Sequence, residues 1–159
     1  MNKKPVLEKI VAKLEHELEM YRRAAKAAFD EATSEQSKAE NKYDTRGLEA
    51  SYLARGQARQ LAEVEEALLQ FRGMLAGPIL RSSTVAPGAL VALEHGKELL
   101  YYFVANCAGG TEIVHDSKEI LVITPQSPLG SQLANHKAGE TVKLSIAGKS
   151  QQRRIAAVH

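Results

Sequence analysis

Two runs of mostly apolar residues with the same spacing occupy the first half of the chain. In each run, successive positions are separated alternately by four and by three residues, the pattern of a helix that packs along its length against another helix. The first run is Leu7, Val11, Leu14, Leu18, Tyr21, Ala25, Ala28 and Ala32, and the second is Ala50, Ala54, Gln57, Leu61, Val64, Leu68, Phe71 and Leu75. This spacing predicts two long helices that share one apolar seam.

The two runs mirror each other about Asn41. If the helices fold back antiparallel, Leu18 lies opposite Val64, and the numbers of every such pair sum to 82. We therefore predict a single antiparallel coiled-coil hairpin over residues 1–76. Each arm of about 33 residues would be about 50 Å long at about 1.5 Å per residue.

Proline and glycine mark where these helices begin and end. Pro5 suits the first turn of a helix because its missing amide proton would have no helical partner there. Gly77 and the proline after it stop the second helix. We expect helices over about residues 5–38 and 46–76, with the tip of the hairpin near residues 37–46.

The pattern changes from helical to extended in the second half of the chain. Residues 77–88 predict a linker, and Ser127 followed by Pro128 predicts the start of a short helix. The predicted strands cover residues 89–94, 99–105, 119–124, 141–146 and 153–158. The expected fold class is therefore α+β, with the hairpin followed by a small antiparallel β domain over residues 89–159.

Composition excludes several classes of function. Charged residues make up 25% of the chain but the net charge is only +2, so nothing predicts a polycation that binds nucleic acid tightly without sequence preference. Cys107 is the only cysteine, which excludes an internal disulfide and a cysteine-rich zinc site. The five histidines show no metal-ligand spacing. An enzyme with its own enclosed active site is therefore not expected.

The chain shows no signal for export or membrane insertion. Its opening, MNKKPVLEKI, lacks the apolar stretch and cleavage site of a signal peptide. No segment approaches the roughly 18 apolar residues that a membrane span needs. We therefore expect a cytoplasmic protein with no membrane partner.

Two carboxylates, Glu40 and Asp44, flank the predicted turn of the hairpin. Carried at the end of a rigid arm, such a pair can hold a divalent cation or orient a water molecule. The alternative is ordinary turn chemistry, since polar turns often carry acids and Asp44 is also suited to cap the second helix.

Basic residues are spread along both predicted helices. They are Arg22, Arg23, Lys26, Arg55 and Arg59. Such residues can line a path for phosphates or for an acidic protein surface. They are equally typical of a solvated helix face with ion pairs.

The segment ILVITPQSPLGSQLANHKAGETVKL, residues 120–144, resembles the Gre family of bacterial transcript-cleavage factors. The order of hairpin, linker and globular domain matches the same family. The resemblance implies an FKBP-like globular domain that binds bacterial RNA polymerase, here through residues around Ser127 to Lys137. It also implies that the hairpin enters the secondary channel, where tip carboxylates help to hold a second Mg²⁺ ion and the attacking water. The polymerase then cleaves the 3′ end of backtracked nascent RNA.

The tip matches the Gre pattern in part. Gre cleavage factors carry an aspartate three residues before a Glu-Asn pair; here Glu40 and Asn41 form the pair, but Ser37 stands at the earlier position. Only Glu40 corresponds by motif, and we assign the second acid to Asp44. We therefore expect a monomeric polymerase regulator, not itself an enzyme, that shares Mg²⁺ with the polymerase and binds no cofactor stably.

Two alternatives follow from the same resemblance. The first is a channel-binding inhibitor or modulator that does not stimulate cleavage. The second is an FKBP-type prolyl isomerase, whose pocket is normally lined by several aromatic side chains. Residues 88–159 offer only Tyr101, Tyr102 and Phe103 as aromatics, so the isomerase is less favoured.

Overall fold

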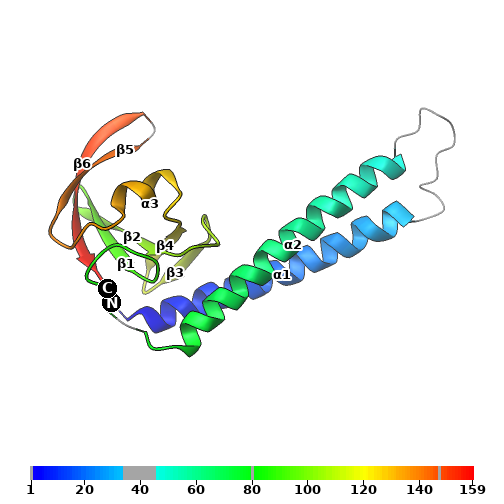
Figure 1. The fold of residues 1–159 in the computed structure, drawn as a ribbon, viewed down its shortest axis with the longest axis horizontal. Coiled ribbons are helices and arrows are strands. Elements are labelled where there is room, and N and C mark those ends of the chain that lie inside the picture. Colours follow the sequence, from blue (N-terminus) through cyan, green and yellow to red (C-terminus); the bar gives the residue numbers. More distant parts are fainter. Residues whose placement is uncertain (1, 34–45, 80, 147) are drawn as a thin grey trace. The chain divides into compact units, whose positions relative to one another are not determined.

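The structure of the chain is a computed structural model that describes residues 2–33, 46–79, 81–146 and 148–159. In chain order, two long helices are followed by four strands, a short helix and two further strands (Figure 1). None of the helices in the described ranges is both long and apolar enough to cross a membrane.

The two long helices are α1 (Lys3–Thr33) and α2 (Arg46–Ala76), and each has 31 residues. They form an antiparallel hairpin (Figure 1), as the mirrored spacing predicts. Helix α1 begins two residues before Pro5, which remains within the first turn, where proline is tolerated. The predicted extension of α1 to residue 38 and the turn near Asn41 lie outside the described residues.

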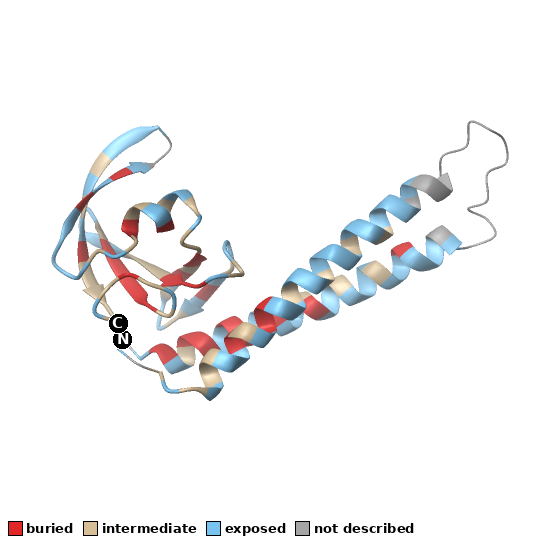
Figure 2. Ribbon diagram, in the orientation of Figure 1, coloured by how far each residue is buried: buried red, intermediate tan, exposed pale blue. Residues whose placement is uncertain are grey.

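Burial along the hairpin follows the predicted seam (Figure 2). Every seam position whose burial is described is buried or half-buried, and Leu14 and Leu18 are only 1% and 8% exposed. An ion pair joins the helices, with Arg22 Nη2 3.0 Å from Glu65 Oε1. The burial of these positions confirms the prediction that the two helices pack against each other along the seam.

The chain divides into two compact units. One, here called the hairpin unit, is Ala12–Gln70, and the other, here called the sheet unit, is Met1–Val11 together with Phe71–His159. Within the sheet unit, the rings of Phe71 and Phe103 lie 6.0 Å apart between centroids. The base of each long helix therefore packs in the same body as the β-sheet.

The sheet has six strands in the order β3-β4-β2-β1-β6-β5. They are β1 (Leu90–His95), β2 (Glu98–Val104), β3 (Glu112–His115), β4 (Lys118–Ile123), β5 (Thr141–Ile146) and β6 (Lys149–Val158). All five predicted strands are present. The additional strand, β3, has only four residues, too few for a recognisable alternation, and it pairs with β4 through a tight turn at Asp116 and Ser117, both at positive φ.

One strand pair departs from the predicted antiparallel arrangement. Strands β2 and β4 run parallel, with Tyr101 opposite Ile120 and Val104 opposite Ile123. All other neighbouring strands are antiparallel. The parallel pair arises because β3 occupies the sheet edge and β4 turns back from it to lie between β3 and β2, in the same direction as β2.

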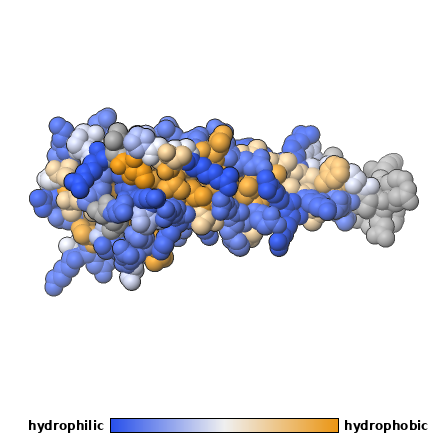
Figure 3. Space-filling model, turned by 90° about the horizontal axis from the view of Figure 1, so that it is seen from below, coloured by the Kyte–Doolittle hydropathy of each residue, from blue (hydrophilic) through white to orange (hydrophobic). Residues whose placement is uncertain are grey.

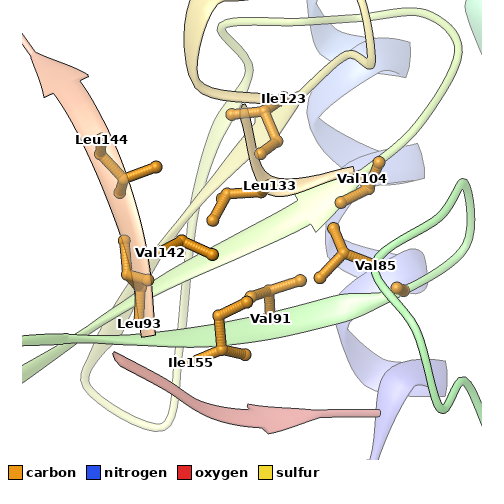
Figure 4. Close-up of a cluster of buried hydrophobic side chains, with 10 residues drawn as sticks. Val85, Val91, Leu93, Val104, Ile123, Leu133, Val142, Leu144 and Ile155 are labelled. Atoms are coloured by element: carbon orange, nitrogen blue, oxygen red, sulfur yellow. The ribbon is translucent and has the colours of Figure 1, made fainter. Parts of the chain in front are cut away.

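One cluster of buried side chains in the sheet unit joins the sheet to the short helix α3 (Pro128–Leu133) (Figure 4). Its buried side chains are Val85, Ala89, Val91, Leu93, Val104, Ile123, Leu133, Val142, Leu144 and Ile155. Val85 comes from the predicted linker, and its backbone N–H donates to the His136 carbonyl at 2.8 Å. The last residues of that linker are therefore part of the core.

Candidate partner-binding site

The carboxylates predicted at the hairpin tip, Glu40 and Asp44, lie outside the described residues, as does Ser37. Their geometry is therefore not part of this structure. Within the described ranges, no group of three or more His, Cys, Asp or Glu side chains is placed to hold a metal ion.

Three of the five basic residues predicted along the helices form ion pairs. Besides the pair of Arg22 with Glu65, Arg23 lies 2.8 Å from Glu19 and Arg59 lies 2.9 Å from Glu63. The hydrogen bond that Arg59 Nε donates to Glu63 Oε1, together with the negative charge of Glu63, raises the pKa of Arg59. For these three residues, the arrangement matches the solvated, ion-paired face that was the alternative interpretation.

Large apolar side chains interrupt the polar surface of the hairpin unit. Phe29, Tyr52 and Leu53 are more than half exposed, at 61%, 63% and 56%. None of these three belongs to the predicted seam. Figure 3 shows apolar residues lying among hydrophilic ones on the face that it displays.

In the sheet unit, Ser127 organises the segment that resembles the Gre family. Its Oγ accepts a hydrogen bond from Gly130 N at 3.1 Å and donates to the Thr124 carbonyl at 2.7 Å. Pro128 occupies the first turn of α3, as the sequence predicts. One hydroxyl therefore fixes both the end of the preceding strand and the start of the helix.

Replacing Ser127 with alanine is expected to lower the free energy of unfolding of the sheet unit by about 1 kcal/mol, because the cap hydrogen bond is lost. Chemical denaturation measures the change. Ser131→Ala is the matched control, since its exposed hydroxyl makes only a long bond of 3.3 Å to the Pro128 carbonyl. Equal losses for the two variants would contradict the capping role.

Gly130 is required by a close approach of backbone. A Cβ atom built at this position would lie 2.0 Å from the carbonyl oxygen of Thr124 and 2.9 Å from Ser127 Oγ. Real Cβ atoms do not approach so closely, and a backbone oxygen cannot rotate away. Gly130 therefore lets the first turn of α3 lie against the end of β4.

A groove lies beside this turn. It has a volume of about 410 Å³ and is lined by Gly109, Gly110, Leu121, Val122, Ile123, Thr124, Ser127, Pro128 and Leu129. Most of these residues present carbon atoms, and Gly109 leaves room because a Cβ there would lie 3.0 Å from Thr124 Cγ2. A groove of this kind accepts an apolar side chain of a partner.

The residue pattern alone does not predict this groove, because adjacent glycines such as Gly109 and Gly110 indicate only a turn. The groove exists because these residues have no side chains. Gly110 N donates to the Val122 carbonyl at 2.9 Å, which ties the glycine turn to β4. The sequence signal available for this groove was the pair of adjacent glycines, Gly109 and Gly110, which comes before the strands that lead to the Ser127-Pro128 turn.

The rest of the segment Ser127–Lys137 is also held firmly. The Gln132 side-chain amide accepts from Ser145 N at 2.6 Å, which joins α3 to strand β5. Asn135 N donates to the Val85 carbonyl at 2.9 Å. A hydrogen bond with His136 lowers the pKa of the Glu140 carboxyl group. The segment Ser127–Lys137 is therefore preorganised by its own contacts.

No protein-family model matches the chain, and no curated protein sequence matches it. Solved structures that are similar to it include the following three. The structure of the transcription factor Gfh1 is 22% identical, with a TM-score of 0.40, and covers 95% of this chain and 94% of that chain. GreA factor homolog 1 of Thermus thermophilus is 20% identical, with a TM-score of 0.38 and 94% of each chain covered. Thermus aquaticus Gfh1 is 24% identical, with a TM-score of 0.40 and coverage of 93% and 92%.

Proposed function

We propose that this protein is a Gre-type regulator of bacterial RNA polymerase. In this proposal, the groove beside Ser127 anchors the sheet unit on the polymerase, and the helical hairpin enters the secondary channel. The tip then stimulates the polymerase to cleave the 3′ end of backtracked RNA. The protein acts as a cytoplasmic monomer without an active site of its own.

The observation that carries the proposal is the hairpin itself. Two helices of 31 residues each correspond to about 46 Å at about 1.5 Å per residue. Their outward faces are largely polar and charged, while the seam between them is apolar. A hairpin of this length exceeds what a small domain needs for its core, and its polar faces suit insertion into a water-filled channel.

The anchor is supported by the groove and its rigid frame. Buried apolar contacts in a preformed site contribute more affinity than solvated charges in a turn. The groove of about 410 Å³ accepts an apolar side chain, and Ser127, Gly130 and Gln132 hold its wall in place. We therefore assign affinity to the sheet unit and activity to the hairpin tip.

The chemistry proposed for the tip uses Glu40 and Asp44. In the polymerase active site, these carboxylates would help to hold a second Mg²⁺ ion shared with the enzyme, which lowers the pKa of the attacking water. That water would attack the phosphorus of a phosphodiester in the backtracked RNA, and the ribose 3′ oxygen would leave and take up a proton to become a hydroxyl. The two acids would also orient the water for attack in line with the leaving oxygen.

A prolyl isomerase is less well supported. Of the three aromatic residues in the second half of the chain, Phe103 is fully buried and faces Phe71 from helix α2. Only Tyr101 and Tyr102 remain partly exposed. A non-cleaving channel regulator uses the same hairpin and groove, so the two regulatory functions are separated by measurement of RNA cleavage.

The test is to add the full chain to stalled, backtracked elongation complexes and to follow the labelled RNA at several Mg²⁺ concentrations. We expect 3′ fragments to be released faster than by polymerase alone. Protein that binds the polymerase but leaves the RNA intact across the Mg²⁺ range would identify a channel-blocking regulator. Protein that does not bind would remove the whole proposal.

A further inference from the structure

A basic cavity lies within the sheet unit, away from the groove beside Ser127. It has a volume of about 610 Å³, and its polar lining consists of Asn2, Lys3, Arg81, Ser82 and His159. Among the described residues, no aspartate or glutamate side chain lines it. Three separate parts of the chain meet here, namely the start of α1, the segment after α2 and the end of β6.

The two cationic side chains of this cavity, Lys3 and Arg81, differ in their exposure to solvent. Lys3 is only 7% exposed, and its Nζ donates to the Gly88 carbonyl at 2.9 Å, whereas Arg81 is exposed at the rim. Burial lowers the pKa of Lys3. Burial also lowers the pKa of His159, and the nearby charges of Arg81 and Lys3 act in the same direction. Two cationic side chains, Lys3 and Arg81, therefore line one concave space, an arrangement suited to an anion.

The space continues into a second, more apolar cavity of about 380 Å³. The two cavities share Lys3, Ile79, Arg81 and Ser82. The second adds apolar surface from Leu7, Met74, Pro78 and Pro87. The combined site thus has a cationic part next to an apolar part, and each volume falls within the roughly 300–1,000 Å³ range of small-molecule sites.

We propose that these adjoining cavities bind a nucleotide. Its phosphate groups lie among Lys3, Arg81 and Ser82, and its base lies against the apolar wall that includes Met74 and Pro78. Arginine and lysine are the side chains that bind phosphate most strongly, and a serine hydroxyl adds a neutral donor. The start of α1 also favours a bound phosphate, because the N-terminal end of a long helix carries a partial positive charge.

A single inorganic phosphate does not fit this arrangement as well. It would satisfy the cations but leave the apolar cavity without a ligand. An uncharged nucleoside would fill the apolar part but make no use of Lys3 and Arg81. Only a ligand with both parts uses the whole site, so the proposal predicts a definite order of affinity.

The test uses the full chain and isothermal titration calorimetry with three probes, namely ADP, adenosine and inorganic phosphate. We expect ADP to bind at least tenfold more tightly than either of the others, and we expect saturating ADP to raise the melting temperature. Failure of millimolar ADP to bind would overturn the proposal. Phosphate binding as tightly as ADP would also overturn it, because the apolar cavity would then contribute nothing.

Variants locate the binding. Arg81→Gln removes an exposed charge at the rim and is expected to weaken ADP at least tenfold, as for the loss of a charge-assisted hydrogen bond, without a change in melting temperature of the free protein. Lys97→Gln, which removes an exposed charge in the turn between β1 and β2, is the matched control and should bind as the wild type does. Equal affinity of Arg81→Gln and wild type would overturn the assignment. The measurement needs no polymerase, so it is independent of the transcription proposal.

Discussion

Replacing Gly130 with alanine is expected to lower the free energy of unfolding of the sheet unit by roughly 4 kcal/mol, the range of the most damaging single substitutions. The added Cβ would lie 2.0 Å from the Thr124 carbonyl oxygen, so either α3 or the end of β4 has to move. Movement of α3 would withdraw Leu133, which is fully buried in the core. Chemical denaturation, followed by circular dichroism of the full chain, measures the loss.

Gly56 provides the matched control for this substitution. It lies in helix α2, and a Cβ there would meet nothing within 4 Å. Gly56→Ala is therefore expected to stabilise the helix by up to about 1 kcal/mol, because alanine has the higher helix propensity. If Gly130→Ala were as stable as Gly56→Ala, the close approach at the start of α3 would not constrain the fold.

Replacing Glu40 and Asp44 with alanine is expected to abolish stimulated RNA cleavage while leaving polymerase affinity almost unchanged. A carboxylate that holds a catalytic metal contributes several kcal/mol to transition-state stabilisation, which corresponds to a rate loss of about 100-fold or more. Neither residue belongs to the predicted apolar seam, so truncation should cost the fold about 0.5 kcal/mol or less, apart from a capping contribution of about 1 kcal/mol from Asp44. Single-turnover cleavage of backtracked complexes measures the rate.

Two controls make this result specific to the metal. Glu35→Ala removes another acid from the same polar segment and is expected to keep most of the cleavage activity. Raised Mg²⁺ is expected to restore part of the activity of Glu40→Ala, because mass action compensates for a weaker metal site. If the variants cleaved RNA as fast as the wild type, the assignment of these acids would be wrong.

The hairpin was predictable because its signal is local and repeated. Each seam position, from Leu7 to Leu75, obeys one spacing rule, and the reversal of the runs about residue 41 implies antiparallel packing. The cap of α3 was predictable for the same reason, since Ser127 and Pro128 act on their immediate neighbours. Local rules of this kind survive folding when tertiary contacts agree with them.

Features that depend on distant segments were not predictable. The four residues of β3 carry too little pattern, and the parallel pairing of β2 with β4 is set by the path of the chain between them. The groove beside Ser127 depends on the close approach of Gly109 to Thr124, a contact between segments that are separate in the sequence. Val85 joins the core through backbone bonds to Asn135 and His136, partners about 50 residues away.

The sheet unit is built from two separate parts of the chain, and this determines which fragments of the protein can fold alone. A fragment that starts at Gly77 would lose Phe71 and would leave the fully buried ring of Phe103 facing water. It would also lose Lys3 and with it the contact to Gly88. Such a fragment would expose a hydrophobic aromatic surface to water and would be prone to aggregate. An autonomous C-terminal module therefore needs the first eleven residues and residues 71–76 of α2 reattached, for example through a short loop that replaces the hairpin unit.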